Sequence, residues 1–291
     1  MNDEIRLLVR ADDMGSTYAS NLGCVECYRN GIARSVEVMV PCAWFEHACR
    51  LLNQHPGLDV GVHMVLTSEW TDYKWRPLTH CPGITDRAGY FLPMVRPREG
   101  FADDCTLVHA NWRIEEVEAE LRAQIELALA RLPRISHLTG HMGWESSHEQ
   151  FAALLEKLER SYSLERRNAA EQVRLMRGYD KWAPLKDQIS SFVDELRKLT
   201  PGTWLFVEHP ALDHPEMDGI CHVGSERVRG ERSTVTRVLT SPDTLSAVAE
   251  LGIVLISYRE WYAPPATLSS ARQPSSKRPE APLQPKAAPL K

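Results

Sequence analysis

The chain has 291 residues, of which 43% are hydrophobic and 25% are charged, and its formal net charge is -5. This composition is ordinary for a globular protein and offers no basic face to nucleic acid or to an anionic membrane. No stretch approaches the roughly 18 apolar residues of a membrane span, and the first residues lack the basic and then apolar layout of a signal peptide. We therefore expect a cytoplasmic protein with a single domain over residues 1–262 and with no nucleic-acid or membrane partner.

Strand and helix patterns alternate along the chain. Seven short apolar or β-branched runs predict strands at residues 5–11, 35–40, 59–63, 134–141, 173–176, 203–209 and 253–257. Six stretches with helical spacing or capping signals predict helices at residues 17–30, 44–54, 114–131, 147–161, 186–199 and 241–251. Because strands alternate with helices, we expect an α/β fold with a parallel sheet and right-handed crossovers.

Two segments break this alternation. Residues 67–112 are rich in aromatic residues, proline and glycine, and a connection of this length predicts a functional lid or a groove-forming insertion. Residues 263–291 consist largely of Pro, Ala, Ser and Lys, which predicts a disordered tail. The folded domain is therefore expected to end near Tyr262.

The seven cysteines are an odd number, and their scatter does not indicate a disulfide framework. Cys24 and Cys27 have the C-x-x-C spacing of zinc or redox sites, but no second pair follows at the distance that a zinc finger needs. Both also fall within a predicted helix. We therefore expect two small apolar residues on one helix face, with reduced thiols.

The first apolar run ends at an acidic pair, Asp12 and Asp13, ahead of a glycine turn. Adjacent carboxylates can divide one task, in which one holds a metal and the other moves a proton. Three later predicted strands also end in polar residues, namely His63, His141, and Glu208 with His209. The carboxyl ends of parallel strands meet on one face of a sheet, where such folds build active sites. We therefore expect these side chains to form one site.

These motifs resemble those of the YdjC-like carbohydrate deacetylases, a family related to the polysaccharide deacetylases. The resemblance is carried by Ala11-Asp12-Asp13-Met14-Gly15 with Asn21, Gly61-Val62-His63-Met64-Val65-Leu66-Thr67, His137-Leu138-Thr139-Gly140-His141, Glu208-His209-Pro210, and a closing stretch from Glu231-Arg232 to Ile256-Ser257-Tyr258-Arg259. It covers residues 5–262. It implies a distorted (β/α) barrel with fewer strands than the eight of the standard barrel, in agreement with the seven strands predicted above.

The resemblance also implies a reaction and the residues that carry it. A divalent metal would be held by Asp13, His63 and His141, while Asp12 would act as the general base and His209 as the general acid. The substrate would be a small acetylated amino sugar or oligosaccharide, and the products acetate and a free amine. A carboxylate with two imidazoles suits zinc best, with magnesium, cobalt, nickel or manganese as alternatives. The family also makes a homodimer the expected assembly.

Other residues near these motifs receive different interpretations. Arg10, directly before the acidic pair, can orient one of its carboxylates, and His137 is interpreted as a hydrogen-bonded strand residue. His148 falls in the first turn of a predicted helix, which indicates a surface residue rather than a ligand. Aromatic residues such as Trp70 and Trp75 suit stacking on sugar rings, or alternatively form an apolar cluster that covers the mouth of the barrel.

Three positions depart from the family pattern. Thr139 stands where the family usually has Asp, and Gly143 and Glu145 stand where further histidines usually follow. Thr139 can orient a neighbouring histidine only through a weaker, neutral hydrogen bond. The three departures leave open a non-catalytic sugar-binding protein on the same barrel. Separately, a metal-dependent amidase or esterase on a non-sugar substrate is the alternative enzyme.

Overall fold

The computed structural model describes residues 4–164 and 173–262. Within these residues, seven strands form one parallel sheet in the order β4-β3-β2-β1-β6-β5, and β7 pairs with β1. The sheet curls into a half-barrel. Because no pairing joins β4 to β5 in this described part of the chain, the half-barrel stays open on one side. The predicted α/β fold with about seven parallel strands is thereby confirmed. The predicted tail at residues 263–291 lies outside the described residues.

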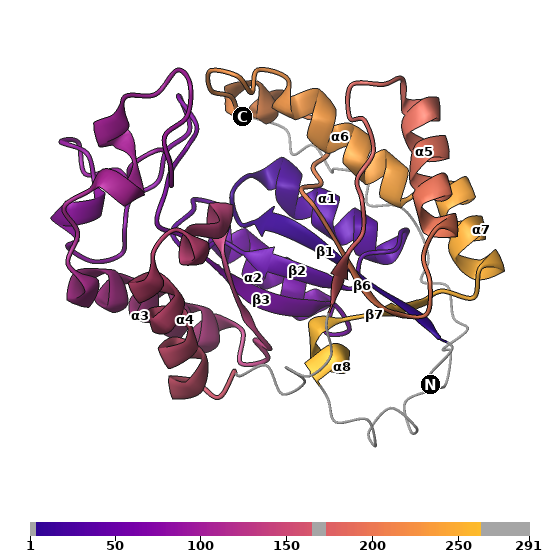
Figure 1. The fold of residues 1–291 in the computed structure, drawn as a ribbon, viewed down its shortest axis with the longest axis horizontal. Helices are drawn as coiled ribbons and strands as arrows, with labels where there is room; N and C mark the ends of the chain where they lie inside the picture. The colour runs from indigo at the N-terminus through magenta and orange to yellow at the C-terminus, as the bar shows by residue number, and fades with distance from the viewer. Residues whose placement is uncertain (1–3, 165–172, 263–291) are drawn as a thin grey trace, which may run out of the picture.

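The strands are β1 (Ile5–Met14), β2 (Ser35–Val38), β3 (Asp59–Met64), β4 (Leu138–Gly140), β5 (Arg174–Leu175), β6 (Gly202–Glu208) and β7 (Val254–Ile256). The helices are α1 (Tyr18–Arg29), α2 (Phe45–Gln54), α3 (Ile114–Arg131), α4 (Glu149–Ser161), α5 (Leu185–Arg197), α6 (Val228–Leu239), α7 (Pro242–Glu250) and α8 (Tyr258–Tyr262). Figure 1 shows α3 and α4 at one end of the sheet and α5, α6 and α7 at the other. Within residues 4–164 and 173–262, none of the helices is long and apolar enough to cross a membrane.

Side-chain caps explain where two of the helices begin. Thr17 precedes α1 in an extended conformation, and its hydroxyl accepts a hydrogen bond from the Ser20 N–H. Ser241 accepts the Thr244 N–H in the same way before α7, and Pro242 occupies the first helical position, where no N–H is needed. Both helices therefore start at the residues where the sequence predicts them.

The sequence pattern does not predict α6, which carries a residue of the site described below. Gly230 and several β-branched residues lower its helix propensity, and its buried face includes the polar side chains of Arg232 and Thr236. Packing against α1 and α5 supplies the stabilisation that local propensity lacks. The short α8 is likewise not predicted.

Residues 67–112 form a packed lobe that includes short 3-10 helices at Pro82–Ile84, Asp103–Cys105 and Leu107–His109. In Figure 1 this lobe lies above α3. Trp70 and Trp75 are only 7% and 4% exposed and belong to the hydrophobic core. Trp70 stacks on His222 with ring centroids 5.3 Å apart, and Nε1 of Trp75 donates to the Thr67 carbonyl at 2.8 Å. Both rings pack in the core, as the apolar-cluster alternative describes, and Trp70 also lines the cavity described below.

Cys24 and Cys27 both lie on α1 and are fully buried. Burial raises the pKa of both thiols, which disfavours the reactive thiolate. In residues 4–164 and 173–262, the one group of side chains suited to hold a metal contains neither cysteine. The interpretation of the C-x-x-C spacing as small core residues is therefore confirmed.

Candidate active site

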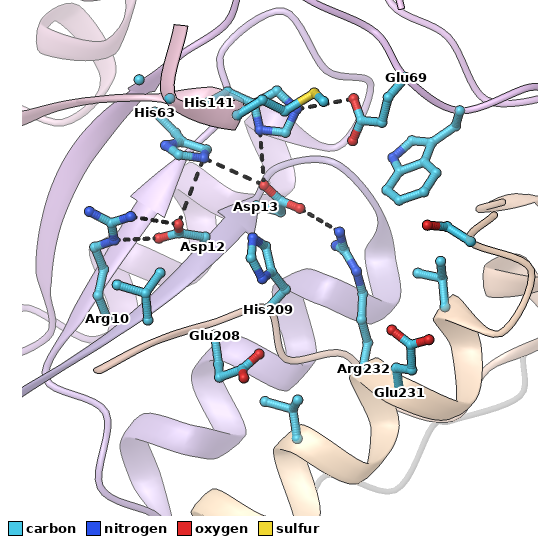
Figure 2. Close-up of a pocket in the computed structure, with 18 of the residues that line it drawn as sticks. Arg10, Asp12, Asp13, His63, Glu69, His141, Glu208, His209, Glu231 and Arg232 are labelled. Carbon is cyan, nitrogen blue, oxygen red and sulfur yellow. Dashed lines mark hydrogen bonds and ion pairs between the residues drawn. The ribbon is translucent and has the colours of Figure 1, made fainter. Parts of the chain in front are cut away.

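A cavity of about 590 Å³ opens at the carboxyl ends of the strands. Its walls include the five site residues that the sequence predicts, namely Asp12, Asp13, His63, His141 and His209. The first two lie in β1 and the third in β3, while His141 directly follows β4 and His209 directly follows β6. Figure 2 shows these side chains converging on one another. The volume falls within the roughly 300–1,000 Å³ that small-molecule sites occupy.

The local geometry of β1 brings both carboxylates into this cavity. Successive side chains of a regular strand point to opposite faces, which would separate Asp12 from Asp13. The register of β1 against β2 instead shifts, because Ala11 pairs with Val36 and Met14 with Val38, so that three steps along β1 match two along β2. Asp13 occupies this bulge with a φ of 66°. A left-handed Asp costs on the order of 1–3 kcal/mol and persists where the surroundings hold it.

Asp13 is held as an anion by its neighbours. Nη2 of Arg232, from α6, contacts its Oδ2 at 2.6 Å. Burial by itself raises the pKa of Asp13, but its neighbours, above all the charge of Arg232, outweigh this effect and hold the pKa well below its usual range. Its other oxygen, Oδ1, is buried and has no hydrogen-bond partner among the described residues. This oxygen faces His63 and His141.

Each of these imidazoles turns one nitrogen toward Asp13 and the other toward a fixed partner. Nε2 of His63 lies 3.6 Å from Asp13 Oδ1, and its Nδ1 lies 2.9 Å from Thr139 Oγ1. Nδ1 of His141 lies 3.4 Å from the same Asp13 oxygen, and its Nε2 lies 3.1 Å from Glu69 Oε2. Because an ionised carboxylate only accepts, Nε2 of His141 carries a hydrogen and Nδ1 faces the centre.

The electrostatics of the two imidazoles differ. Burial lowers the pKa of His63 to about 3, and the neighbouring His141 acts in the same direction. Burial also lowers the pKa of His141, but the carboxylates of Glu69 and Asp13 outweigh it and raise this pKa to about 10. The corner of the cavity between His141 and the two carboxylates therefore attracts positive charge.

The ligand atoms of Asp13, His63 and His141 fit a divalent metal. They are buried and lie within 4.8 Å of one another. Tetrahedral ligands at metal distances of about 2.0–2.2 Å are separated by about 3.3–3.6 Å. The oxygen–nitrogen distances of 3.4 and 3.6 Å agree with this geometry. Three protein ligands would leave a position open toward the cavity, as catalytic metal sites require.

Asp12 has a different environment from its neighbour Asp13. Nη2 and Nε of Arg10 contact Oδ2 and Oδ1 of Asp12 at 2.8 and 2.7 Å, and Nη1 of Arg10 donates to the Tyr258 hydroxyl at 3.1 Å. Burial raises the pKa of Asp12, although the charge of Arg10 opposes it. The pKa values of the two carboxylates therefore move in opposite directions, so that Asp13 stays ionised and Asp12 accepts a proton more readily. Arg10 orients Asp12, as the sequence suggested.

His209 lies on the opposite side of the acidic pair from His63 and His141. Figure 2 shows it between Asp12 and Arg232. Burial lowers the pKa of His209 to about 4, against the charge of Asp13 and together with that of Arg232. The ring is therefore neutral at physiological pH and able to exchange a proton with a group in the cavity.

Four charged residues complete the site without having been predicted in these roles, namely Glu37, Glu69, Lys181 and Arg232. Glu69 holds His141 and Arg232 holds Asp13, as described above. Lys181 pairs with Glu208 at 2.6 Å, and Glu37 accepts a hydrogen bond from Thr139 at 2.7 Å. Glu69 follows the His63 motif by two residues and Arg232 lies inside a quoted motif. For Glu69 and Arg232, the position of a charged residue beside or inside a motif is therefore the sequence feature that could have predicted a role in the site.

The interpretations of His137 and His148 are confirmed. His137 is 1% exposed, and its ring nitrogens are within hydrogen-bond distance of Glu37 and Ser136. His148 is exposed and caps α4, where its ring accepts the Gln150 N–H. Neither histidine lines the cavity.

Two of the three departures from the family pattern also line the cavity. Met142 and Gly143 follow His141 with φ values of 56° and 63°, so that two consecutive left-handed residues turn the chain. Glycine adopts this conformation without steric cost. Glu145 comes next in the cavity wall. The wall after His141 therefore carries a turn and a carboxylate in place of imidazoles.

The fold and this site together define a class, an α/β half-barrel with a carboxylate and imidazole centre at the carboxyl ends of its strands. The family follows from comparison with known proteins. The chain belongs to the YdjC-like proteins, whose family model matches residues 6–250.

Named relatives agree with this assignment. A protein from Geobacillus stearothermophilus named carbohydrate deacetylase is 31% identical over 268 residues, which cover 88% of this chain and 97% of the relative. A carbohydrate deacetylase from Thermus thermophilus is 32% identical over 237 residues, which cover 72% of this chain and 79% of the relative. A crystal structure of a protein from Enterococcus faecalis V583 superposes with a TM-score of 0.68 at 21% identity, covering 88% of this chain and 98% of that one. This last likeness shows a shared fold.

Proposed function

We propose that this protein is a divalent-metal-dependent deacetylase that removes the N-acetyl group from a small acetylated amino sugar or oligosaccharide. The observation that carries the proposal is the buried group of Asp13, His63 and His141, with the carboxylate of Asp12 3.9 Å from His63. Relatives named carbohydrate deacetylases, matched over 88% of this chain, support the sugar substrate. A cytoplasmic location and a homodimer stay predictions from the sequence.

In this proposal Asp12 takes the proton of the attacking water. Burial raises its pKa, and the contact with Arg10 holds the carboxylate in place for the transfer. When bound, a divalent metal supplies a Lewis acid that acidifies water and stabilises negative charge on the acetyl oxygen. Asp12 lies beside His63, so the base is adjacent to the centre where that water would be oriented.

His209 takes up a proton from solvent, because its lowered pKa leaves the ring neutral, and then delivers that proton to the departing amine. A histidine with a lowered pKa is a strong acid once protonated, so it releases its proton readily to a basic nitrogen. Two further residues hold the ligands rather than the substrate, because Arg232 fixes one oxygen of Asp13 and Glu69 fixes the far nitrogen of His141. Each reacting group thus has a partner that sets its orientation.

We propose zinc as the metal. One carboxylate oxygen and two imidazole nitrogens are typical zinc ligands, and both imidazoles have an outer hydrogen-bond partner of the kind that zinc sites use. Cobalt, nickel and manganese accept the same donors, whereas magnesium prefers a set made of oxygen atoms. The metal requirement is therefore tested with each ion in turn.

Acetate release tests the proposed function. Metal-stripped protein is incubated with N-acetylglucosamine, its short oligomers, acetamide and a simple acetate ester, with and without each divalent ion. We expect release from at least one acetylated sugar, and only with metal. Release from the non-sugar amide or ester alone would favour the amidase or esterase alternative. Sugar binding without release under any condition would favour the non-catalytic one.

A further inference from the structure

Glu37 is a buried carboxylate to which the reaction as described gives no role. It lies in β2 and has no exposed surface. The register places it opposite Gly61 of β3. A Cβ atom at position 61 would stand 2.5 Å from Glu37 Oε2 and would also clash with Nε2 of His137. The missing side chain of Gly61 therefore lets Glu37 reach across β3 toward the next strand.

The two oxygens of Glu37 have different partners. Oε1 lies 2.5 Å from Nε2 of His137, and Oε2 accepts the Thr139 hydroxyl at 2.7 Å. The oxygen of that hydroxyl lies 2.9 Å from Nδ1 of His63. Burial raises the pKa of Glu37, but His137 and Arg10 outweigh this effect and lower it. The carboxylate is therefore ionised and acts only as an acceptor.

The single hydrogen of the Thr139 hydroxyl decides which atoms donate and which accept in the hydrogen bonds that link Glu37, Thr139 and His63. A hydroxyl has one hydrogen, and Thr139 uses it on Glu37. Its oxygen can therefore only accept from His63, which places a hydrogen on Nδ1 of that ring. Nε2 is then left with a lone pair, and this is the nitrogen that lies 3.6 Å from Asp13 Oδ1.

We propose that Glu37 is a positioning residue for the metal centre and acts on His63 through the hydroxyl of Thr139. This inference rests on the proposed function, because it concerns the same centre. Glu37 selects the tautomer of His63 and holds the ring so that the lone pair of Nε2 faces Asp13 and the proposed metal site. The Glu37 carboxylate in β2 thus fixes the hydroxyl of Thr139 in β4, and this hydroxyl in turn accepts the hydrogen bond from His63.

Zinc affinity of the full chain, measured by competition with a chromogenic chelator, tests the hydrogen-bonded link from Glu37 through Thr139 to His63. Thr139→Val cuts it but leaves the contact between Glu37 and His137, and we expect an affinity lower by about 10–100-fold. Thr139→Ser keeps a hydroxyl and should bind like the unsubstituted protein. Ser136→Ala removes the 2.7 Å hydrogen bond on the other side of His137 and should also bind normally. Unchanged affinity in Thr139→Val would overturn the proposal.

Moving the carboxylate separates positioning from simple structural support. Glu37→Gln should weaken zinc binding, and adding Thr139→Asp should restore most of the affinity, because the new carboxylate lies beside Nδ1 of His63. Thr139→Asp alone brings two carboxylates within hydrogen-bond distance, so we expect it to bind zinc more weakly and melt lower than the double variant. A double variant that binds no better than Glu37→Gln would contradict the positioning role.

The tautomer of His63 gives a test that needs no variant to fold. In ¹⁵N NMR of the unsubstituted, metal-stripped protein, we expect a hydrogen on Nδ1 and none on Nε2 of His63. The opposite tautomer would overturn the proposal. Failure of the unsubstituted protein to bind any divalent ion would instead contradict the proposed function, while the NMR result would still decide how Glu37 acts on this ring.

Discussion

Replacing Asp12 with Asn is expected to lower the rate of acetate release by about 10²–10⁴-fold, the range that a positioned general base contributes. The amide has nearly the size of the carboxylate and still accepts a hydrogen bond from Arg10, but it cannot take a proton from water. Asp12 is not one of the three residues that fit the metal. The variant should therefore retain one equivalent of metal, measured by elemental analysis beside the rate.

Asp213→Asn is the matched control for this variant. Asp213 lies on the surface, where it pairs with Arg229 at 2.7 Å, and its loss should leave both rate and metal content unchanged. Full activity in Asp12→Asn would rule out its role as the base. Loss of the metal together with the activity would make Asp12 a ligand instead.

Replacing His63 with Ala is expected to weaken metal binding by more than about 100-fold, because it removes a ligand, whereas loss of an outer partner costs about 10–100-fold. Acetate release should fall at low metal concentration in proportion to the unoccupied sites. Chelator competition measures the affinity, and circular dichroism checks that the variant keeps its fold.

His148→Ala is the matched control for His63→Ala. It removes an exposed imidazole that caps α4 and lies outside the cavity, so metal affinity should not change. A His63→Ala variant that binds metal as tightly as the unsubstituted protein would show that the ion sits elsewhere. Tight binding with lost activity would leave His63 a role in orientation only.

The sheet and the predicted site positions follow from simple periodicities. Strands such as β3 and β6 show as apolar runs, and the polar residues that end them meet because parallel strands present their carboxyl ends on one face. His63, His141 and His209 could be placed together for this reason. The bulge at Asp13 could not be foreseen, because it depends on the register of β1 against β2, and the Asp13 carboxylate is paired with Arg232 from a helix distant in the sequence.

Residues that act across strands are harder to predict from one sequence. Glu37 is an isolated acid in a β-branched run, and its partner Thr139 lies 102 positions away. The contact between Glu37 and Thr139 depends on the register of β2, β3 and β4 and on the missing side chain of Gly61. Such information is contained in the pairing rather than in any local pattern.

The tryptophans of the lobe show the opposite difficulty. Trp70 and Trp75 lie in a segment with no helical or strand periodicity, so the sequence gives no sign of which faces are covered. Both rings are nevertheless packed in the hydrophobic core, and Trp70 also lines the cavity. Aromatic content alone predicts an apolar surface but does not distinguish a binding platform from a core.

The central claim is that Asp13, His63 and His141 hold the single divalent ion on which deacetylation depends. The most direct test is a titration of metal-stripped protein with zinc, with acetate release from an acetylated sugar measured after each addition. The account predicts that the rate rises in proportion to the added zinc and stops rising at one equivalent per chain. Full activity before any metal is added, or unchanged zinc-dependent activity in His63→Ala, would contradict it.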